Sequence, residues 1–314
     1  MNKKFENICK MPQTRLKKYV EIKLRETHKD ITVGDGFVFA KGTFPVLLVA
    51  HLDTVHDLLP GIIEYNQEKD SVSCLEGIGG DDRCGVYMIL EIVKNYNCSV
   101  LFCEDEEIGT VGAKKFIQTD LAKELEFNYA IELDRKGSND AVFYDCDNEE
   151  FEDFITADFY NTAYGSFSDI SVVAPFLKCA AVNLSCGYYN AHTQQEYVVL
   201  REMERSIEEV CKILDKTTEA DKFEYIESKY SSSYFGNYYR GSSYYKGNSY
   251  SWYDTYNEEY YTNYYLIEYY DENGKTDWFE TYAVSEAEAV GRFLMWNPGL
   301  CYTNIIDVLV DKVN

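Results

Sequence analysis

The sequence predicts an α/β fold with a mixed, largely parallel central sheet flanked by helices, followed by a small α+β module. Three observations support this prediction. Apolar runs of strand length alternate with segments of helical periodicity over the first two thirds of the chain. The strand-like runs are apolar at almost every position, which is typical of parallel strands buried on both faces. Near residue 228 the composition changes abruptly, so the remaining chain cannot continue the same core.

The apolar pattern predicts the elements of the first part in order. Pro12 suits the first turn of a helix, and the strand-like run after Gly42 ends at His51. We expect a strand at 141–144 to pair beside the strand at 127–133. The predicted helices are 12–26, 84–96, 112–118 and the amphipathic 199–216, and the predicted strands are a hairpin at 34–42, then 45–50, 99–103, 127–133, 141–144 and 179–184.

A tyrosine-rich segment separates this part from the C-terminus. Between Tyr230 and Tyr270 lie 15 of the 29 tyrosines, mixed with Ser, Gly and Asn. Such a segment lacks the aliphatic residues that a core needs, which favours a flexible linker. A sticky tyrosine surface for a partner is the alternative. We therefore predict a catalytic domain at 1–226, a linker at 227–262 and a ββαβ module at 263–314.

The charge of the chain limits its partners. The net charge is −24 and the isoelectric point is near 4.5. A nucleic-acid-binding groove needs clustered Lys and Arg, so nucleic acid is not an expected partner. The start of the chain has no apolar leader, and no run of 18 apolar residues follows. We expect a soluble, cytoplasmic protein that does not bind membranes, whose acidic surface serves solubility.

The ten cysteines are scattered singly, and none forms a CxxC pair. Without that spacing a structural zinc finger is not predicted. Several cysteines lie inside apolar strand patterns, as in the run that ends at Cys103. We expect buried, reduced thiols.

Acids and imidazoles recur in order along the first two thirds of the chain, each at or just after the end of a predicted strand or before a helix. In open α/β sheets that edge is where ligands bind. The order and placement predict a two-metal hydrolytic site. Its candidate members are His51, Asp53, Asp81, Asp82, Glu106, Glu107, Asp134 and His192.

Asp81 is the candidate for the carboxylate that bridges two divalent metals, because it follows the glycine-rich turn Gly79-Gly80. The alternative for Asp81 and Asp82 is a helix cap with a first-turn acid. His51 can ligate a metal while Asp53, two residues on, holds its imidazole. The alternative for His51 is a polar loop residue.

Glu106 and Glu107 are adjacent, so we expect them to point in different directions. That favours one metal ligand and one general base, although a solvated acidic loop is an alternative. Asp134 and His192 complete two coordination sets, and Glu132 is a less favoured substitute for Asp134. Two further histidines, His28 and His56, have no comparable setting and are expected at the surface.

These motifs resemble those of the co-catalytic dizinc exopeptidases and deacylases, which include bacterial leucine aminopeptidase, tripeptidase T and carboxypeptidase G. The matching segments are AHLDTVHD, GIGGDDRCG, EDEEIGTVGAKKF, the acid in IELDR and NAHTQQEYV, between residues 46 and about 200. All five occur in the order of the family.

The resemblance implies a role for each matching residue. One zinc ion would be bound by His51, Asp81 and Asp134, and the other by Asp81, Glu107 and His192. Glu106 would be the general base, and Asp53 would orient His51. Asp81 follows Asp53 by 28 positions, and His192 follows Asp134 by 58. Neither gap accommodates the lid or dimerisation domain of larger relatives, which slightly favours a monomer over a weak homo-oligomer.

We hypothesise a zinc-dependent metallopeptidase, an exopeptidase of the aminopeptidase type that acts on short peptides. A deacylase or amidase acting on N-acyl amino acids is an alternative with the same metals. A second alternative is an inactive scaffold that binds a partner through its tyrosine-rich tail. The segment 165–169 resembles a pocket-lining loop of some relatives, or it is a simple turn.

Overall fold

The computed structural model of this chain describes residues 3–165, 167–228, 263–270, 275–283, 289–290, 292–294, 297, 300 and 304–312. The chain divides into two compact units, residues 1–246 and 247–314. Residues 229–262 lie outside the described residues, so the predicted tyrosine-rich linker stays a prediction.

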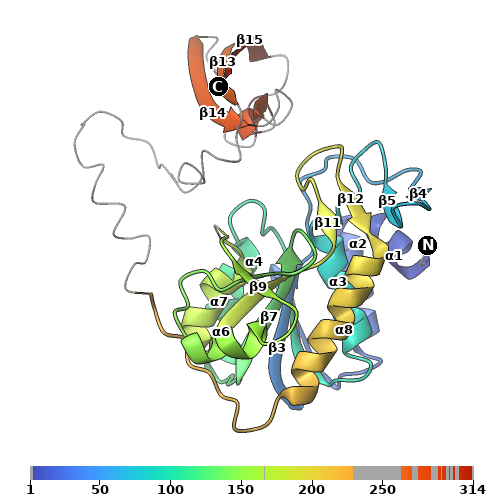
Figure 1. The fold of residues 1–314 in the computed structure, drawn as a ribbon, viewed down its shortest axis with the longest axis vertical. Helices are drawn as coiled ribbons and strands as arrows, with labels where there is room; N and C mark the ends of the chain where they lie inside the picture. The colour runs from blue at the N-terminus through green and yellow to red at the C-terminus, as the bar shows by residue number, and fades with distance from the viewer. Residues whose placement is uncertain are drawn as a thin grey trace. The chain divides into compact units, whose positions relative to one another are not determined.

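The larger unit alternates strands and helices, as expected, and the predicted strands and helices of its centre are present with boundaries shifted by a few residues (Figure 1). The helices are α1 (Lys3–Cys9), α2 (Gln13–Leu24), α3 (Gly80–Ile92), α4 (Val111–Ile117), α5 (Asp120–Lys123), α6 (Glu149–Thr156), α7 (Asp169–Leu177) and α8 (Leu200–Lys216). The strands are β1 (Asp30–Gly34), β2 (Phe37–Lys41), β3 (Phe44–His51), β4 (Glu64–Asn66), β5 (Ser71–Ser73), β6 (Cys98–Cys103), β7 (Tyr129–Arg135), β8 (Asp140–Val142), β9 (Asn161–Ala163), β10 (Ala181–Ser185), β11 (Tyr188–Tyr189) and β12 (Tyr197–Val199).

Eight strands form the central sheet, in the order β1-β2-β6-β3-β7-β10-β8-β9. Its middle is parallel, because β3 pairs in parallel with β6 and β7, and β7 pairs in parallel with β10. This confirms the predicted mixed, largely parallel sheet. The expected pairing of β8 with β7 is wrong: β10 lies between them and pairs antiparallel with β8. The chain crosses back through α6 and α7 before β10, and sequence order does not reveal which strand takes the edge of β7.

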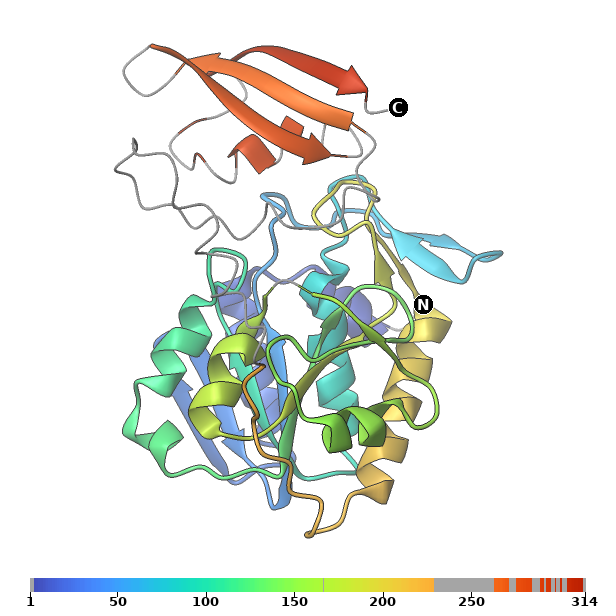
Figure 2. The same cartoon turned by 60° about the vertical axis from the view of Figure 1, so that its left-hand side comes forward.

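Helices cover both faces of this sheet (Figures 1 and 2). Successive residues of a strand point to opposite faces. On β3, Leu48 and Ala50 therefore join the core that includes α3 and α8, whereas Leu47 and Val49 join the core that includes α4 and α7. Every one of these four side chains is fully buried. The uninterrupted apolar run follows from burial on both faces.

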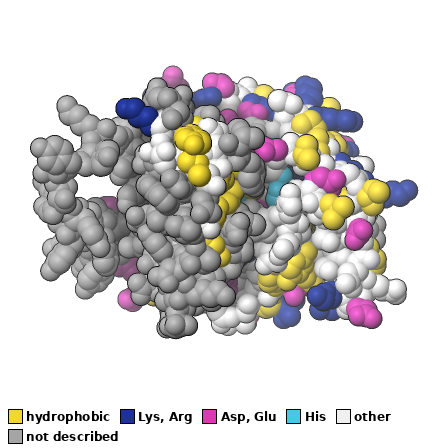
Figure 3. Space-filling view, turned by 90° about the horizontal axis from the view of Figure 1, so that it is seen from above, with side chains coloured by type: hydrophobic (Ala, Val, Ile, Leu, Met, Phe, Trp, Pro, Cys, Tyr) yellow, Lys and Arg dark blue, Asp and Glu magenta, His cyan; other side chains and the backbone are white. Residues whose placement is uncertain are grey.

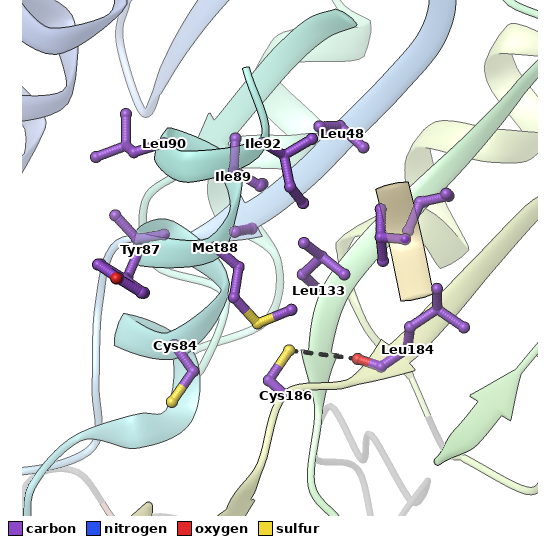
Figure 4. Packing of buried hydrophobic residues seen from close by; sticks show 14 of the residues in the cluster. Leu48, Cys84, Tyr87, Met88, Ile89, Leu90, Ile92, Leu133, Leu184 and Cys186 are labelled. Atoms are coloured by element: carbon purple, nitrogen blue, oxygen red, sulfur yellow. Dashed lines mark hydrogen bonds between the residues drawn. The ribbon is translucent and has the colours of Figure 1, made fainter. Parts of the chain in front are cut away.

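The helix α3 provides the side chains that cover the middle of the sheet on one face. Figure 4 shows Met88 extending from α3 toward Leu133 of β7, with Leu184 and Cys186 beside it. All four of these side chains are fully buried. This packing holds α3 against β7 and β10.

A second, antiparallel sheet of four short strands has the order β11-β12-β5-β4. The sequence pattern did not predict it, because strands of two or three residues are too short to display an alternation. The sheet brings the chain around residues 64–73 beside the chain around residues 188–199. It thereby joins the segment between the first and second motifs to the segment that carries the last motif.

The smaller unit contains β13 (Asn263–Tyr270), β14 (Thr276–Ala283) and β15 (Ile305–Lys312), in the antiparallel order β14-β13-β15. Residues 289–290 and 292–294 are helical. The ring of Phe293 packs on Tyr269 of β13, with ring centroids 4.6 Å apart. The strands of the predicted ββαβ module are present, whereas the turn at 271–274 and parts of the helix at 285–296 lie outside the described residues.

The cysteines of the described residues are unpaired. Nine are free thiols, and eight of these nine are buried. This agrees with the prediction of buried, reduced thiols, with Cys301 outside the described residues. Within the described ranges, no helix combines the length and the apolar character needed to cross a membrane.

Candidate metal centre

The fold gathers the predicted site residues at the carboxyl ends of the central strands. His51 is the last residue of β3, and Asp134 lies next to the end of β7. The other members lie in the segments that follow or precede these strands. Asp81 stands at the start of α3, Glu106 and Glu107 follow β6, and His192 lies between β11 and β12.

Asp81 stands between the two histidines. Its Oδ1 lies 3.1 Å from the Nε2 of His51, and its Oδ2 lies 3.1 Å from the Nε2 of His192. On one side, the Nε2 of His51 is also 3.6 Å from Asp134 Oδ1. On the other side, the Nε2 of His192 is 3.0 Å from Glu107 Oε1. Two clusters of nitrogen and oxygen atoms therefore share one carboxylate.

Three groups of side chains in the described part of the chain could hold a metal ion, each with ligand atoms within 4.8 Å of one another. Two groups have the membership that the family resemblance implies. The third joins His51 to both Glu106 and Glu107, so the two glutamate carboxylates are closer together than we expected from their adjacency. The groups are His51, Asp81 and Asp134; Asp81, Glu107 and His192; and His51, Glu106 and Glu107.

The two aspartates at the start of α3 have different surroundings. Asp82 Oδ1 accepts the backbone N–H of Gly85 at 2.9 Å, and its Oδ2 accepts the N–H of His51 at 3.1 Å. The helix-capping alternative therefore describes Asp82. Both aspartates have a non-helical backbone, but Asp81 directs its carboxylate at the histidines.

Asp53 contacts both the first and the third motif. Its Oδ1 lies 3.2 Å from the Nδ1 of His51, and its two oxygens accept the N–H groups of Glu106 and Glu107 at 3.0 Å. Because a carboxylate only accepts, His51 presents a protonated Nδ1 to Asp53. In the neutral form of this ring, the lone pair at Nε2 would then be available to a metal ion.

Three residues hold Asp134, and the sequence did not single out two of them, Tyr188 and Asn183. The hydroxyl of Tyr188 donates to its backbone oxygen at 3.0 Å and to Oδ1 at 3.3 Å. Ser168 donates to Oδ2 at 3.2 Å, and Asn183 Oδ1 accepts its backbone N–H at 2.9 Å. Ser168, in the segment 165–169, therefore lies beside Asp134, and the pocket-lining role of this segment stays a prediction.

Burial and neighbouring charges shift the pKa values of the acids in this cluster in different directions. Burial raises the pKa of Asp134 to about 7, and the neighbouring Asp81 adds to the shift. Burial raises the pKa of Glu106 well above its usual range, and the charge of Glu107 reinforces it. For Asp81, contacts with His192 and His51 outweigh burial and lower the pKa. Carboxylates crowded in this way are stabilised by bound cations.

Two more acids lie fully buried near Asp134 without a hydrogen-bond partner among the described residues, namely Glu132 and Asp169. Burial raises the pKa of both carboxyl groups, to about 7 for Asp169. Neither residue belongs to any of the three candidate metal groups.

The expectation that His28 and His56 lie at the surface is wrong. The ring of His28 is buried, and its Nε2 lies 2.7 Å from the backbone oxygen of Cys98. His56 is half-buried, and its Nε2 lies 2.8 Å from Glu196 Oε2. Each histidine lies within hydrogen-bond distance of a polar group from a distant segment. Residue type alone does not predict such a partner, so the sequence did not indicate that these histidines are buried.

The surface seen in Figure 3 has acidic and apolar side chains on either side of a visible histidine. Among the residues next to the candidate ligands in the sequence, Ile108 follows Glu107 and is 74% exposed. Phe167, which precedes Ser168, is 47% exposed. Apolar side chains are therefore available beside an acidic cluster.

No protein-family model matches the sequence, and no curated protein matches it in sequence. Solved structures do match in fold. Aminopeptidase PepT from Bacillus cereus has a TM-score of 0.54 at 15% identity, and the match covers 68% of this chain and 96% of that one. A tripeptidase from Staphylococcus aureus gives 0.53 at 12% identity, covering 67% and 95%. A Zn-dependent exopeptidase from Parabacteroides distasonis gives 0.51 at 13% identity, covering 68% and 95%. At these identities the likeness establishes a common fold.

Proposed function

We propose that this chain, which has the fold of the zinc-dependent exopeptidases, is a dinuclear zinc aminopeptidase that acts on short peptides. One observation carries the proposal. The carboxylate of Asp81 has one oxygen 3.1 Å from His51 and the other 3.1 Å from His192. Such an arrangement suits a carboxylate that bridges two metal ions about 3.5–4 Å apart.

The donor atoms suit zinc, which binds imidazole nitrogen and carboxylate oxygen. Glu107 Oε1 lies 3.0 Å from His192 Nε2 yet accepts no hydrogen bond within the described part of the chain. A buried carboxylate oxygen without a partner is costly, and a cation would satisfy it. One ion would be held by His51, Asp81 and Asp134, and the other by Asp81, Glu107 and His192.

Zinc in this position supplies a Lewis acid that acidifies water and polarises the carbonyl of the scissile amide. Glu106 would take the proton of the attacking water and return it to the leaving amine. The assignment of Glu106 as base and Glu107 as ligand is supported by the contact between Glu107 and His192. The raised pKa of Glu106, caused first by burial, suits a group that gains and loses a proton.

Asp53 would fix the position of the His51 imidazole relative to the general base Glu106. It fixes the Nδ1 side of His51 and the backbone of Glu106 with one carboxylate. The distance from ligand to base is therefore set by a single short side chain. Tyr188 and Ser168 would orient Asp134 in the same manner.

The surrounding charge favours a substrate with a free α-ammonium group over one with a free carboxylate. Carboxylates are recognised strongly by basic side chains, above all by Arg. Arg83 is buried and donates to the backbone oxygens of Leu52 and Met11. Arg135 pairs with Asp140, and Lys136 also has a partner in the structure. The acids of the centre remain to attract an amine.

The proposal is tested with the purified full chain, zinc and a substrate panel. We expect cleavage of dipeptides and tripeptides with a free N-terminus, and loss of that activity when the N-terminus is acetylated. Cleavage of N-acyl amino acids alone would replace the aminopeptidase with a deacylase. Absence of bound zinc together with absence of any cleavage would leave a binding protein.

A further inference from the structure

Glu196 and His56 form a buried polar pair beside the centre that the proposed reaction does not use. Glu196 is fully buried, in the segment between His192 and β12. Its Oε2 accepts the backbone N–H of Gly79 at 2.8 Å and lies 2.8 Å from the Nε2 of His56. Its Oε1 accepts the backbone N–H of Asp81 at 2.9 Å. Because the carboxylate only accepts, His56 donates through Nε2.

This single carboxylate connects three segments that carry the site. His56 lies in the segment after β3, three positions beyond Asp53, and His51 is the last residue of β3. The turn before α3 contributes the N–H of Asp81. Glu196 itself follows His192 by four positions. A displacement of any one segment would therefore strain or break its hydrogen bond to Glu196 and so change the positions of the other two.

The turn before α3 is packed closely around the pair. Gly77 has φ +89°, and a Cβ at this position would lie 2.2 Å from the ring of His56. At Gly80, a Cβ would lie 2.7 Å from Val198 Cγ2 and 3.3 Å from Glu196 Oε1. The close contacts at Gly77 and Gly80 therefore leave the backbone before Asp81 little space to adopt another conformation beside Glu196.

A buried carboxylate is a costly way to join loops, since an apolar group of the same size would avoid the desolvation. Unlike an apolar group, the carboxylate fixes the orientation of the backbone, because two N–H groups two residues apart must both point at it. The second of these belongs to Asp81, the only residue shared by the two predicted ligand sets. The arrangement thus controls where the shared carboxylate points.

We propose that Glu196, supported by His56, is a positioning residue that holds the Asp81 carboxylate between His51 and His192 and so sets the zinc affinity of the centre. This inference rests on the proposed function. Partners of this kind behind a metal ligand change metal affinity or activity by about 10–100-fold when they are altered.

The test is Glu196→Gln in the full chain, with zinc affinity measured by competition against a chromogenic chelator. Glutamine keeps the volume but turns one acceptor into a donor that faces a backbone N–H. We expect zinc affinity to fall by about 10–100-fold. At saturating zinc, kcat should stay reduced while KM changes little, because Glu196 is not expected to touch the substrate. His56→Gln keeps a donor, so it should lower zinc affinity by a smaller factor.

The matched control is Asp70→Asn. Asp70 also joins distant segments, since its Oδ2 accepts the backbone N–H of Arg201 at 3.1 Å and its Oδ1 accepts the hydroxyl of Tyr65 at 2.7 Å. It lies outside the candidate metal groups, so Asp70→Asn should bind zinc like the wild type.

The outcomes separate the inference from the proposed function. A folded Glu196→Gln with lower thermal stability but wild-type zinc affinity and kcat would show a purely structural role and overturn the inference. If Glu196→Gln does not fold by circular dichroism, His56→Gln decides, and wild-type zinc affinity in that variant overturns it. A wild-type chain that binds no zinc would instead contradict the proposed function.

Discussion

The strands β3 and β7 change character along their length. Leu48 and Ile131 are fully buried among apolar neighbours. Three residues later, the same strands present His51 and Asp134 to a cluster of acids. Burial of the apolar part stabilises the fold by roughly 25 cal/mol per Å². The polar ends oppose folding, since buried like charges repel. On each strand, the apolar segment that stabilises the fold is therefore adjacent to the polar segment that carries the candidate site, and the two can be altered separately.

Glu106→Gln should have the largest effect, because Glu106 belongs to the acidic cluster that the polar ends of β3 and β7 face. We expect kcat to fall by about 10²–10⁴-fold, because the proton acceptor is lost, while two zinc ions remain bound. Asp105→Asn is the matched control, since Asp105 carries the same charge one residue away and accepts from Gln13 of α2. Peptidase assays and metal analysis of both variants check this. Equal losses in the two variants would mean that the loop, and not the Glu106 carboxylate, is responsible.

Leu48→Ala changes the apolar part alone. The cavity and the lost burial should reduce the free energy of unfolding by about 2–5 kcal/mol. Zinc stoichiometry and kcat of the folded fraction should stay at wild-type values, as measured by urea unfolding followed by assays under native conditions. If the folded variant loses activity as Glu106→Gln does, then the apolar part and the polar end of the strand cannot be altered separately.

Zinc should raise the free energy of unfolding by binding at the polar ends of the strands. When the free zinc concentration is about 1,000 times the dissociation constant, the free energy of unfolding rises by about 4 kcal/mol. Thermal unfolding with and without a chelator measures this rise, which should be the same in Leu48→Ala as in the wild type. An unfolding temperature that does not respond to zinc would contradict the assignment of the cluster as a metal centre.

Asp134→Asn should have the smallest effect on the metal-free protein. It removes one charge from a crowded group whose pKa burial raises to about 7. The metal-free free energy of unfolding should therefore change by less than about 1 kcal/mol or increase. Chemical denaturation in the presence of a chelator checks this. Destabilisation comparable to that of Leu48→Ala would show that the carboxylate is needed for folding.

The central strands and the positions of the candidate ligands were predictable because both leave local signals. An apolar run that ends at His51 indicates a buried strand and its terminus at once. The acids at 106 and 107 follow the next such run. Parallel pairing then brings these ends together without further information.

The partners behind the ligands were not predictable in the same way. Glu196 is one acid among several polar loop residues, and only its burial reveals that it accepts from Gly79 and Asp81. Tyr188 lies on a two-residue strand that is too short for periodicity to reveal. The place of β8 beyond β10 depends on a long crossover, which local pattern does not encode.

Asp81 is proposed to join two zinc ions at one centre. X-ray absorption at the zinc edge of the purified wild-type chain, together with metal analysis, measures the number of ions, their ligands and their separation. We predict two zinc ions per chain, nitrogen and oxygen ligands only, and a zinc–zinc distance of about 3.5–4 Å. Sulfur ligands, a single isolated ion or no bound zinc would contradict the proposed dinuclear centre.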